Sequence, residues 1–160
     1  LHLLREDPKS VQAIGKSHTK SGMADIAYLT LHFNSNKIAH FNCSWISPVK
    51  IRHMLIGGTK KMIVFNDLES TEKVKVYDSR YEEKIINPDS NKFLTDYRIG
   101  DVYVPKLNLT EGLTNLVSDF ASAIKSRKIP VSNNNISLMV VKILEAAEKS
   151  LKDNGKIVKL

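Results

Sequence analysis

At 160 residues, the chain has the size of one ordinary domain that can bury a core without disulfides or metals. Hydrophobic residues make up 42% of the sequence and charged residues 26%, as in a soluble globular protein, and no apolar run is long enough to cross a bilayer. The composition therefore disfavours a membrane protein and predicts one domain over residues 1–160.

The net charge of +7 arises from 24 basic residues against 17 acidic ones. Clustered basic residues would indicate nucleic acid or another anionic partner. Here they are spread over the whole length, so a solvated surface is favoured and nucleic acid is disfavoured. The single cysteine, Cys43, has no partner for an internal disulfide, and the sequence shows no signal-peptide pattern, which together predict the cytoplasm. The apolar-rich start at Leu1 predicts the tail of a helix that was cut from a longer chain.

The first half of the chain predicts a sheet. From about Ser10 to Asp78, apolar and polar residues alternate with a period of two, which is typical of strands with two unlike faces. Strands at 26–33 and 39–45 flank a turn at 34–37 and predict a hairpin. Further strands are predicted at 50–56, 61–65 and 73–77, with Gly57-Gly58 as a turn.

The two faces of these strands differ in character. In the hairpin, Leu29 and Leu31 share a face that is expected to pack on the core, while Tyr28 lies on the other face. Because Tyr28, Met54 and Ile56 cannot face the same helix layer as their alternating neighbours, we expect another subunit to cover the second sheet face. The sequence thus predicts a dimer or tetramer that assembles through the sheet.

Between Asp78 and Leu109 the periodicity fades and turn-forming residues appear at 87–91, 99–101 and Pro105, so a long loop is expected there. Apolar residues then recur at helical spacing. One helix is predicted after Thr110, as its N-cap, to about Arg127.

A second helix is predicted from Ile136 to Leu151, with capping residues at 133–135 and a stop at Gly155, followed by a short strand at 156–160. The predicted fold class is α+β, an open and mostly antiparallel sheet with two helices packed on one face.

No catalytic constellation is present. The five histidines show no spacing that converges on a metal, and neither a P-loop nor a Gly-x-Gly-x-x-Gly motif occurs. The segment from Ser44 to Arg52 is unusual because it combines the only tryptophan with a proline and two cations. Trp45 offers a flat apolar face to a sugar ring, and Lys50 and Arg52 can hold a phosphate. The alternative, with Trp45 in the core and the cations solvated, has at least equal support from the residues alone.

This segment, continued to Leu68, resembles the C-terminal domain of the glucose-fructose oxidoreductase and inositol dehydrogenase (Gfo/Idh/MocA) family. Three further blocks at 25–33, 97–105 and 140–151 resemble the same domain in the same order. The Trp-x-x-Pro-x-Lys-x-Arg pattern, from Trp45 to Arg52, is most similar to members that act on sugar nucleotides in polysaccharide synthesis. Two departures are Glu111-Gly112-Leu113 in place of Glu-Pro-Leu, and 117–120 in place of Glu-x-x-His-Phe.

The resemblance implies a substrate-binding and oligomerisation domain of an NAD(P)-dependent oxidoreductase that acts on a sugar or sugar nucleotide. The Rossmann domain that binds NAD or NADP, and the catalytic lysine, would precede Leu1, so this chain alone is expected to be inactive and to hold no catalytic, cofactor-binding or metal-binding residue. Trp45, Lys50 and Arg52 are the expected substrate contacts, with Arg98 and Lys106 of the predicted loop as helpers for a diphosphate. The rival hypothesis is a non-catalytic module that only oligomerises or binds a polyanion.

Overall fold

The computed structural model describes residues 1–20, 22–87, 92–108 and 110–160. These residues form two compact units. The first unit comprises Leu1–Pro48 and Thr110–Leu160, and the second comprises Val49–Leu109. Each unit contains one four-stranded sheet, and every described strand pair is antiparallel. The predicted α+β class is confirmed.

The helices and strands follow the chain in this order: β1 (Ser10–Lys16), β2 (Ile26–His32), β3 (Ile38–Ser44), β4 (His53–Gly57), β5 (Met62–Asn66), β6 (Val74–Asn87), β7 (Lys92–Tyr103), α1 (Gly112–Ser126), α2 (Asn134–Lys152) and β8 (Val158–Lys159). Among the described residues, no helix has both the length and the apolar character that a membrane span requires.

Sheet A belongs to the first unit and has the strand order β3-β2-β1-β8. The predicted hairpin is present as β2 and β3, and the turn between them is closed by a hydrogen bond from the Phe33 backbone N–H to the Lys37 carbonyl oxygen. The register pairs Val11 with Leu31, and Ala13 with Leu29. Because paired residues share a face, the apolar residues of β1 and β2 form one continuous surface.

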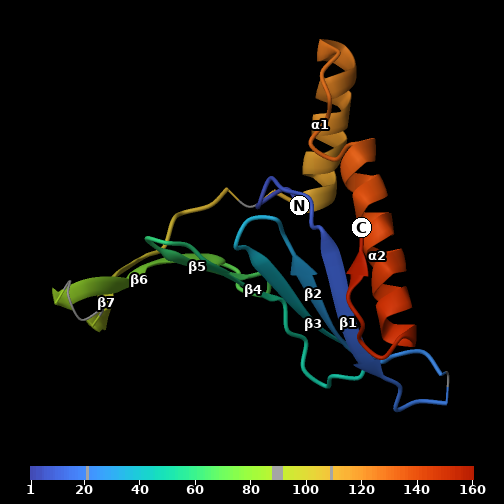
Figure 1. Ribbon diagram of the computed structural model, residues 1–160. Coiled ribbons are helices and arrows are strands. Elements are labelled where there is room, and N and C mark those ends of the chain that lie inside the picture. The colour runs from blue at the N-terminus through green and yellow to red at the C-terminus, as the bar shows by residue number, and fades with distance from the viewer. Residues whose placement is uncertain (21, 88–91, 109) are drawn as a thin grey trace. The chain divides into compact units, whose positions relative to one another are not determined.

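Helix α2 packs against this apolar surface of β1 and β8 (Figure 1). The core between sheet and helix consists of the following buried residues: Val11, Ala13, Leu31, Phe33, Ile143, Ala146 and Ala147. Gly15 allows the close approach, since a Cβ atom at this position would lie 2.8 Å from the Ile26 carbonyl oxygen and 3.0 Å from Leu151 Cδ2. The helical spacing in the sequence therefore identified the helix that builds the core, although Val140 and Leu144 of the predicted stripe are exposed.

Ser150 joins α2 to the sheet. Its side chain is fully buried, its Oγ accepts a hydrogen bond from the Ala13 backbone N–H at 2.8 Å, and it lies 2.6 Å from the Lys156 carbonyl oxygen, to which it donates. A hydroxyl both donates and accepts, so one side chain satisfies two backbone groups that are held away from water.

The two helices begin differently. Asn133 caps α2, and its side chain accepts from the backbone N–H groups of Asn135 and Ile136, as the sequence predicts. The predicted N-cap of α1 at Thr110 is wrong. Glu111 has the extended backbone (φ −56°, ψ 136°) of the capping position and makes no side-chain hydrogen bond there, which leaves Thr110 one residue outside the helix.

The sequence predicted that both helices pack on one face of the sheet, but helix α1 does not pack on sheet A. Only Ala123 of this helix is buried. Its apolar residues at helical spacing are between 51% and 66% exposed: Leu113, Leu116, Val117, Phe120 and Ile124. Of the two predicted helices, α2 alone covers the sheet.

Sheet B forms the second unit, with the strand order β4-β5-β6-β7. The loop predicted at 78–109 is wrong, because most of this segment forms the long antiparallel pair of β6 and β7. Residues 78–84 are polar at almost every position, so a strand in this segment does not produce alternation. Gly100 lies inside β7, where a Cβ atom would sit 2.7 Å from the Asp78 carbonyl oxygen, next to a shift in register. Gly100 therefore marks an irregularity within a strand and not the turn that the sequence predicted at 99–101.

The strand predicted at 50–56 begins at His53. The turn predicted at 87–91 lies almost wholly outside the described residues, since 88–91 are not among them. None of the described residues of the second unit is as buried as the core of the first, and both faces of sheet B carry half-buried or exposed apolar side chains.

Candidate functional site

Trp45 follows β3 directly and is 91% exposed. Its backbone is fixed, because its N–H donates to the Asp25 carbonyl oxygen at 2.7 Å. The exposure excludes the alternative in which Trp45 belongs to the core of this chain. Ile46, Val49 and Ile51 are also exposed, so the whole connection between the sheets presents apolar side chains.

Arg52 precedes β4 and takes part in a network at one end of β5. Its guanidinium lies 3.2 Å from Asp67 Oδ2, and Lys73 Nζ lies 3.4 Å from Asp67 Oδ1. The hydrogen bond from Arg52, together with Lys73, lowers the pKa of Asp67 from its ordinary value. Two cations thus share one carboxylate, and the network keeps a net positive charge. Lys50 is exposed two residues before Arg52.

The sequence predicted that Arg98 lies in a loop, but in the structure it lies on β7. Its guanidinium lies 3.2 Å from Asp78 Oδ2 of β6. In the register between β5 and β6, Phe65 pairs with Val74 and Met62 pairs with Tyr77. Asp78 therefore lies beyond the Met62 end of β5, whereas the Arg52 network lies at the other end of this strand. Lys106 is exposed beyond the end of β7. Arg52 and Arg98 therefore belong to two separate ion pairs of the second unit, while Trp45 belongs to the first unit.

A polar cluster lies on the open face of sheet A, which we define as the face turned away from α2. The rings of Tyr28 and His40 are stacked with their centroids 6.2 Å apart and their planes at 15°. His40 Nδ1 lies 3.1 Å from Thr30 Oγ1. Nε2 of neighbouring His32 is buried and has no hydrogen-bond partner among the described residues. The sequence assigned Tyr28 to this face but gave no sign that its ring stacks on His40, because that contact depends on the register between β2 and β3.

Asp25 fixes the loop between β1 and β2 just before β2 begins. Its carboxylate accepts from the backbone N–H groups of His18 and Thr19 at 2.6 and 3.0 Å, and from His18 Nδ1 at 2.7 Å. These contacts, the His18 side chain first, lower the pKa of Asp25. Asp25 is buried while the His18 ring is exposed, so the arrangement acts as a loop anchor.

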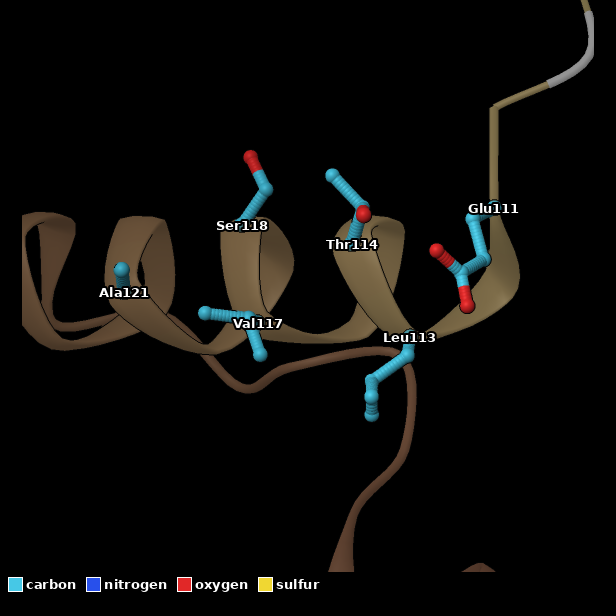
Figure 2. A pocket seen from close by; sticks show the side chains of 6 residues that line it. All are labelled: Glu111, Leu113, Thr114, Val117, Ser118 and Ala121. Atoms are coloured by element: carbon cyan, nitrogen blue, oxygen red, sulfur yellow. The ribbon is translucent and has the colours of Figure 1, made fainter.

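The hollow along α1 is lined by Glu111, Leu113, Thr114, Val117, Ser118 and Ala121. Figure 2 shows that the lining side chains all come from α1 and its N-cap residue Glu111, with Thr114 and Ser118 on one side of the helix and Leu113 and Val117 on the other. One helix does not surround a ligand, so this hollow is an exposed helix face and not a binding pocket. The described residues also contain no group of three or more side chains that could hold a metal ion.

The described residues form an α+β arrangement of two antiparallel sheets and two helices. The family model described as the GFO/IDH/MocA C-terminal domain matches residues 1–64, and the resemblance predicted from the sequence is thereby confirmed. No curated protein matches the chain.

Solved structures share the fold over nearly the whole chain. The UDP-N-acetylglucosamine 3-dehydrogenase from Acidithiobacillus ferrooxidans matches 93% of this chain with a TM-score of 0.71 and 15% identity, over 42% of its own length. The aldose-aldose oxidoreductase from Caulobacter crescentus matches 97% with a TM-score of 0.70 and 14% identity, also over 42% of its length. The putative oxidoreductase yvaA from Bacillus subtilis matches 99% with a TM-score of 0.70 and 17% identity, over 47% of its length. This chain therefore spans less than half of each of these proteins.

Proposed function

We propose that this chain is the substrate-binding and oligomerisation domain of an NAD(P)-dependent oxidoreductase that acts on a sugar or sugar nucleotide in the cytoplasm. The observation that carries the proposal is the shared fold, which extends over 93% of this chain in a dehydrogenase named for a sugar nucleotide and over 97% in one named for aldoses. The lone, exposed thiol of Cys43 fits a reducing compartment.

The described residues do not fit a nicotinamide dinucleotide. Such cofactors bind where a glycine-rich turn joins a parallel strand to a helix N-terminus, and every described strand pair here is antiparallel. We therefore assign cofactor binding to protein outside these 160 residues. The roles proposed for this chain are to hold the substrate and to assemble subunits.

For the substrate, we propose that exposed Trp45 stacks on a sugar ring and that the Arg52 network attracts the diphosphate. Trp45 and Lys50 are fully available to a ligand, and Arg52 is already held by Asp67, which fixes the direction of its guanidinium. Arg98, at the other end of β5, and Lys106, beyond the end of β7, are proposed as helpers.

The test is an Arg52→Ala substitution in the intact oxidoreductase. Loss of one charge-assisted contact of about 1.5 to 3 kcal/mol should raise KM for the sugar nucleotide by about tenfold to a hundredfold, with little change in thermal stability. Asp67→Asn breaks the same ion pair but keeps both cations, so it should leave KM within about threefold. Lys152→Ala, which breaks an exposed ion pair on α2 of the first unit, is the control. If Arg52→Ala and Lys50→Ala both leave KM and kcat unchanged, this segment does not hold the diphosphate.

The rival function is a polyanion-binding module, favoured by the net charge of +7. Calorimetry separates the two hypotheses. The isolated chain should show no saturable micromolar binding of NAD(H) or NADP(H) under either hypothesis, whereas tight and salt-sensitive binding of heparin would favour the rival.

A further inference from the structure

Asp25 connects two chain segments at the same end of sheet A, the loop after β1 and the segment after β3 (Figure 1). Its backbone carbonyl oxygen accepts from the Trp45 N–H at 2.7 Å. Its carboxylate oxygen Oδ1 lies 2.7 Å from Nδ1 of His18. One residue thus contacts both the exposed tryptophan and an exposed histidine, and all three lie within the first unit.

The strand register places Trp45 and Asp25 on one face of the sheet. Ile26 of β2 pairs with Ser44 of β3. One step beyond this pair, Asp25 lies opposite Trp45, in agreement with the hydrogen bond between their backbones. Because opposite residues share a face, the indole and the Asp25 carboxylate are placed on the same side of the sheet.

The His18 ring has one nitrogen left for a ligand. An ionised carboxylate only accepts hydrogen bonds, so Nδ1 of His18 is the donor to Asp25. Nε2 lies across the ring, away from Asp25, and the His18 side chain is 57% exposed. Nε2 accepts a hydrogen bond when the ring is neutral and donates one when the ring is protonated. A sugar hydroxyl both donates and accepts, so it can bind Nε2 in either state.

The His18 ring is held in place before any ligand arrives. The Asp25 side chain is only 5% exposed, and it also accepts from the backbone N–H groups of His18 and Thr19 at 2.6 and 3.0 Å. These contacts fix both the ring and the loop that carries it. A side chain that is already ordered loses little conformational freedom on binding, so His18 is preorganised as a ligand contact.

We propose that His18 is a further sugar-binding residue, whose Nε2 hydrogen-bonds a hydroxyl of the ring that stacks on Trp45. This inference rests on the sugar-binding role proposed above for Trp45. Since β2 lies between β1 and β3, the imidazole and the indole reach the sugar from two sides. Strands two places apart are separated by about 10 Å, which leaves room for one pyranose ring between the two side chains. The substrate contacts thereby extend to the loop between β1 and β2.

Calorimetry of the 160-residue chain with UDP-glucose, and with UDP as the probe that lacks a sugar ring, tests this contact. His18→Asn keeps a nitrogen donor near the position of Nδ1, and hence the contact with Asp25, but has no counterpart of Nε2. It should raise Kd for UDP-glucose about threefold to tenfold, the effect of one hydrogen bond, and leave Kd for UDP unchanged. His2→Asn, at an exposed position before β1, is the matched control and should change neither value. Thermal unfolding establishes that both variants are folded.

The outcomes that contradict the proposal are distinguishable. If His18→Asn leaves Kd for UDP-glucose unchanged while Trp45→Ala raises it, the sugar site stands and the His18 contact falls. If His18→Asn raises Kd equally for both probes, a contact between His18 and a sugar hydroxyl is excluded. If Trp45→Ala leaves Kd for UDP-glucose unchanged, or the unmodified chain binds neither probe, the sugar-binding role proposed for Trp45 fails and this inference fails with it.

Discussion

Both sheets of this protein carry apolar side chains, but among the described residues only sheet A has buried ones. In sheet A, Val11 and Leu31 are buried beneath α2, and the opposite face mixes polar side chains with exposed Ile14 and Tyr28. In sheet B, Met54 and Leu55 are adjacent residues on opposite faces, and both are exposed (43% and 69%). Alternation along a strand shows which residues share a face, but burial also requires a helix whose own apolar stripe matches that face. A four-stranded sheet without a covered face gains little from burial.

The largest expected effect comes from truncating one core residue in each sheet. Leu31→Ala should reduce the free energy of unfolding by about 2 to 5 kcal/mol, because it leaves a cavity beneath α2. Ile63→Ala, at a half-buried position in the middle of sheet B, should cost about 1 kcal/mol or less. Urea denaturation followed by circular dichroism measures both. Equal losses would mean that sheet B is covered as fully as sheet A.

The junction between α2 and β1 should come next. Ser150→Ala leaves the Ala13 N–H and the Lys156 carbonyl oxygen without their partner in a buried site, with an expected loss of about 1 to 3 kcal/mol. Ser137→Ala, on the exposed first turn of α2, is the control and should stay within about 0.5 kcal/mol. A neutral Ser150→Ala would show that water reaches this junction.

The helix caps sharpen the contrast between α2 and α1. Asn133→Ala removes the acceptor of two backbone N–H groups and should reduce stability by about 1 kcal/mol. Glu111→Ala should have almost no effect through capping, since Glu111 makes no side-chain cap hydrogen bond. Thermal unfolding of both variants measures the difference. Comparable losses would mean that Glu111 acts on the α1 N-terminus through its charge.

The smallest effects are expected from the two carboxylates with lowered pKa values, Asp25 in the first unit and Asp67 in the second. A pKa that is lower in the folded state gives stability that is fully present above the unfolded value, about 3.9, and is lost as the pH falls through the folded value. The free energy of unfolding of the unchanged chain should therefore fall between neutral pH and pH 3. In Asp25→Asn and in Asp67→Asn this fall should be smaller, because asparagine does not titrate.

Salt distinguishes these two carboxylates. Asp67 is 40% exposed, so 1 M NaCl should screen its pairing with Arg52, whereas buried Asp25 should keep its contribution. Unfolding at pH 7, with and without salt, compares each variant with the unchanged chain. The comparison fails if Asp25→Asn and Asp67→Asn respond to salt alike.

Much of the first unit can be predicted from the sequence because its signals are local. The β2–β3 hairpin, the N-cap at Asn133 and the stop at Gly155 each depend on a few neighbouring residues. The β6–β7 pair was missed for a physical reason. Its stability comes from backbone pairing between distant segments, and a strand that is polar on both faces leaves no period in the sequence.

The candidate site was only partly predictable. The exposed positions of Trp45, Lys50 and Arg52 agree with the roles expected for them, which stay predictions. The partners of the cations could not be read from the sequence, because Asp67 reaches Arg52 only through the pairing of β4 with β5. The Tyr28–His40 stack likewise depends on a strand register that residue types do not encode.

The exposure of Trp45 has a spectroscopic consequence. It is the only tryptophan in the chain and is already 91% exposed in the folded chain. Its indole therefore has nearly the same aqueous surroundings before and after unfolding, so intrinsic emission should hardly change during denaturation. The same emission should shift to shorter wavelength when a sugar ring or another protein surface covers the indole. Fluorescence of the unmodified chain thus reports on occupancy at the end of β3 and is almost blind to folding.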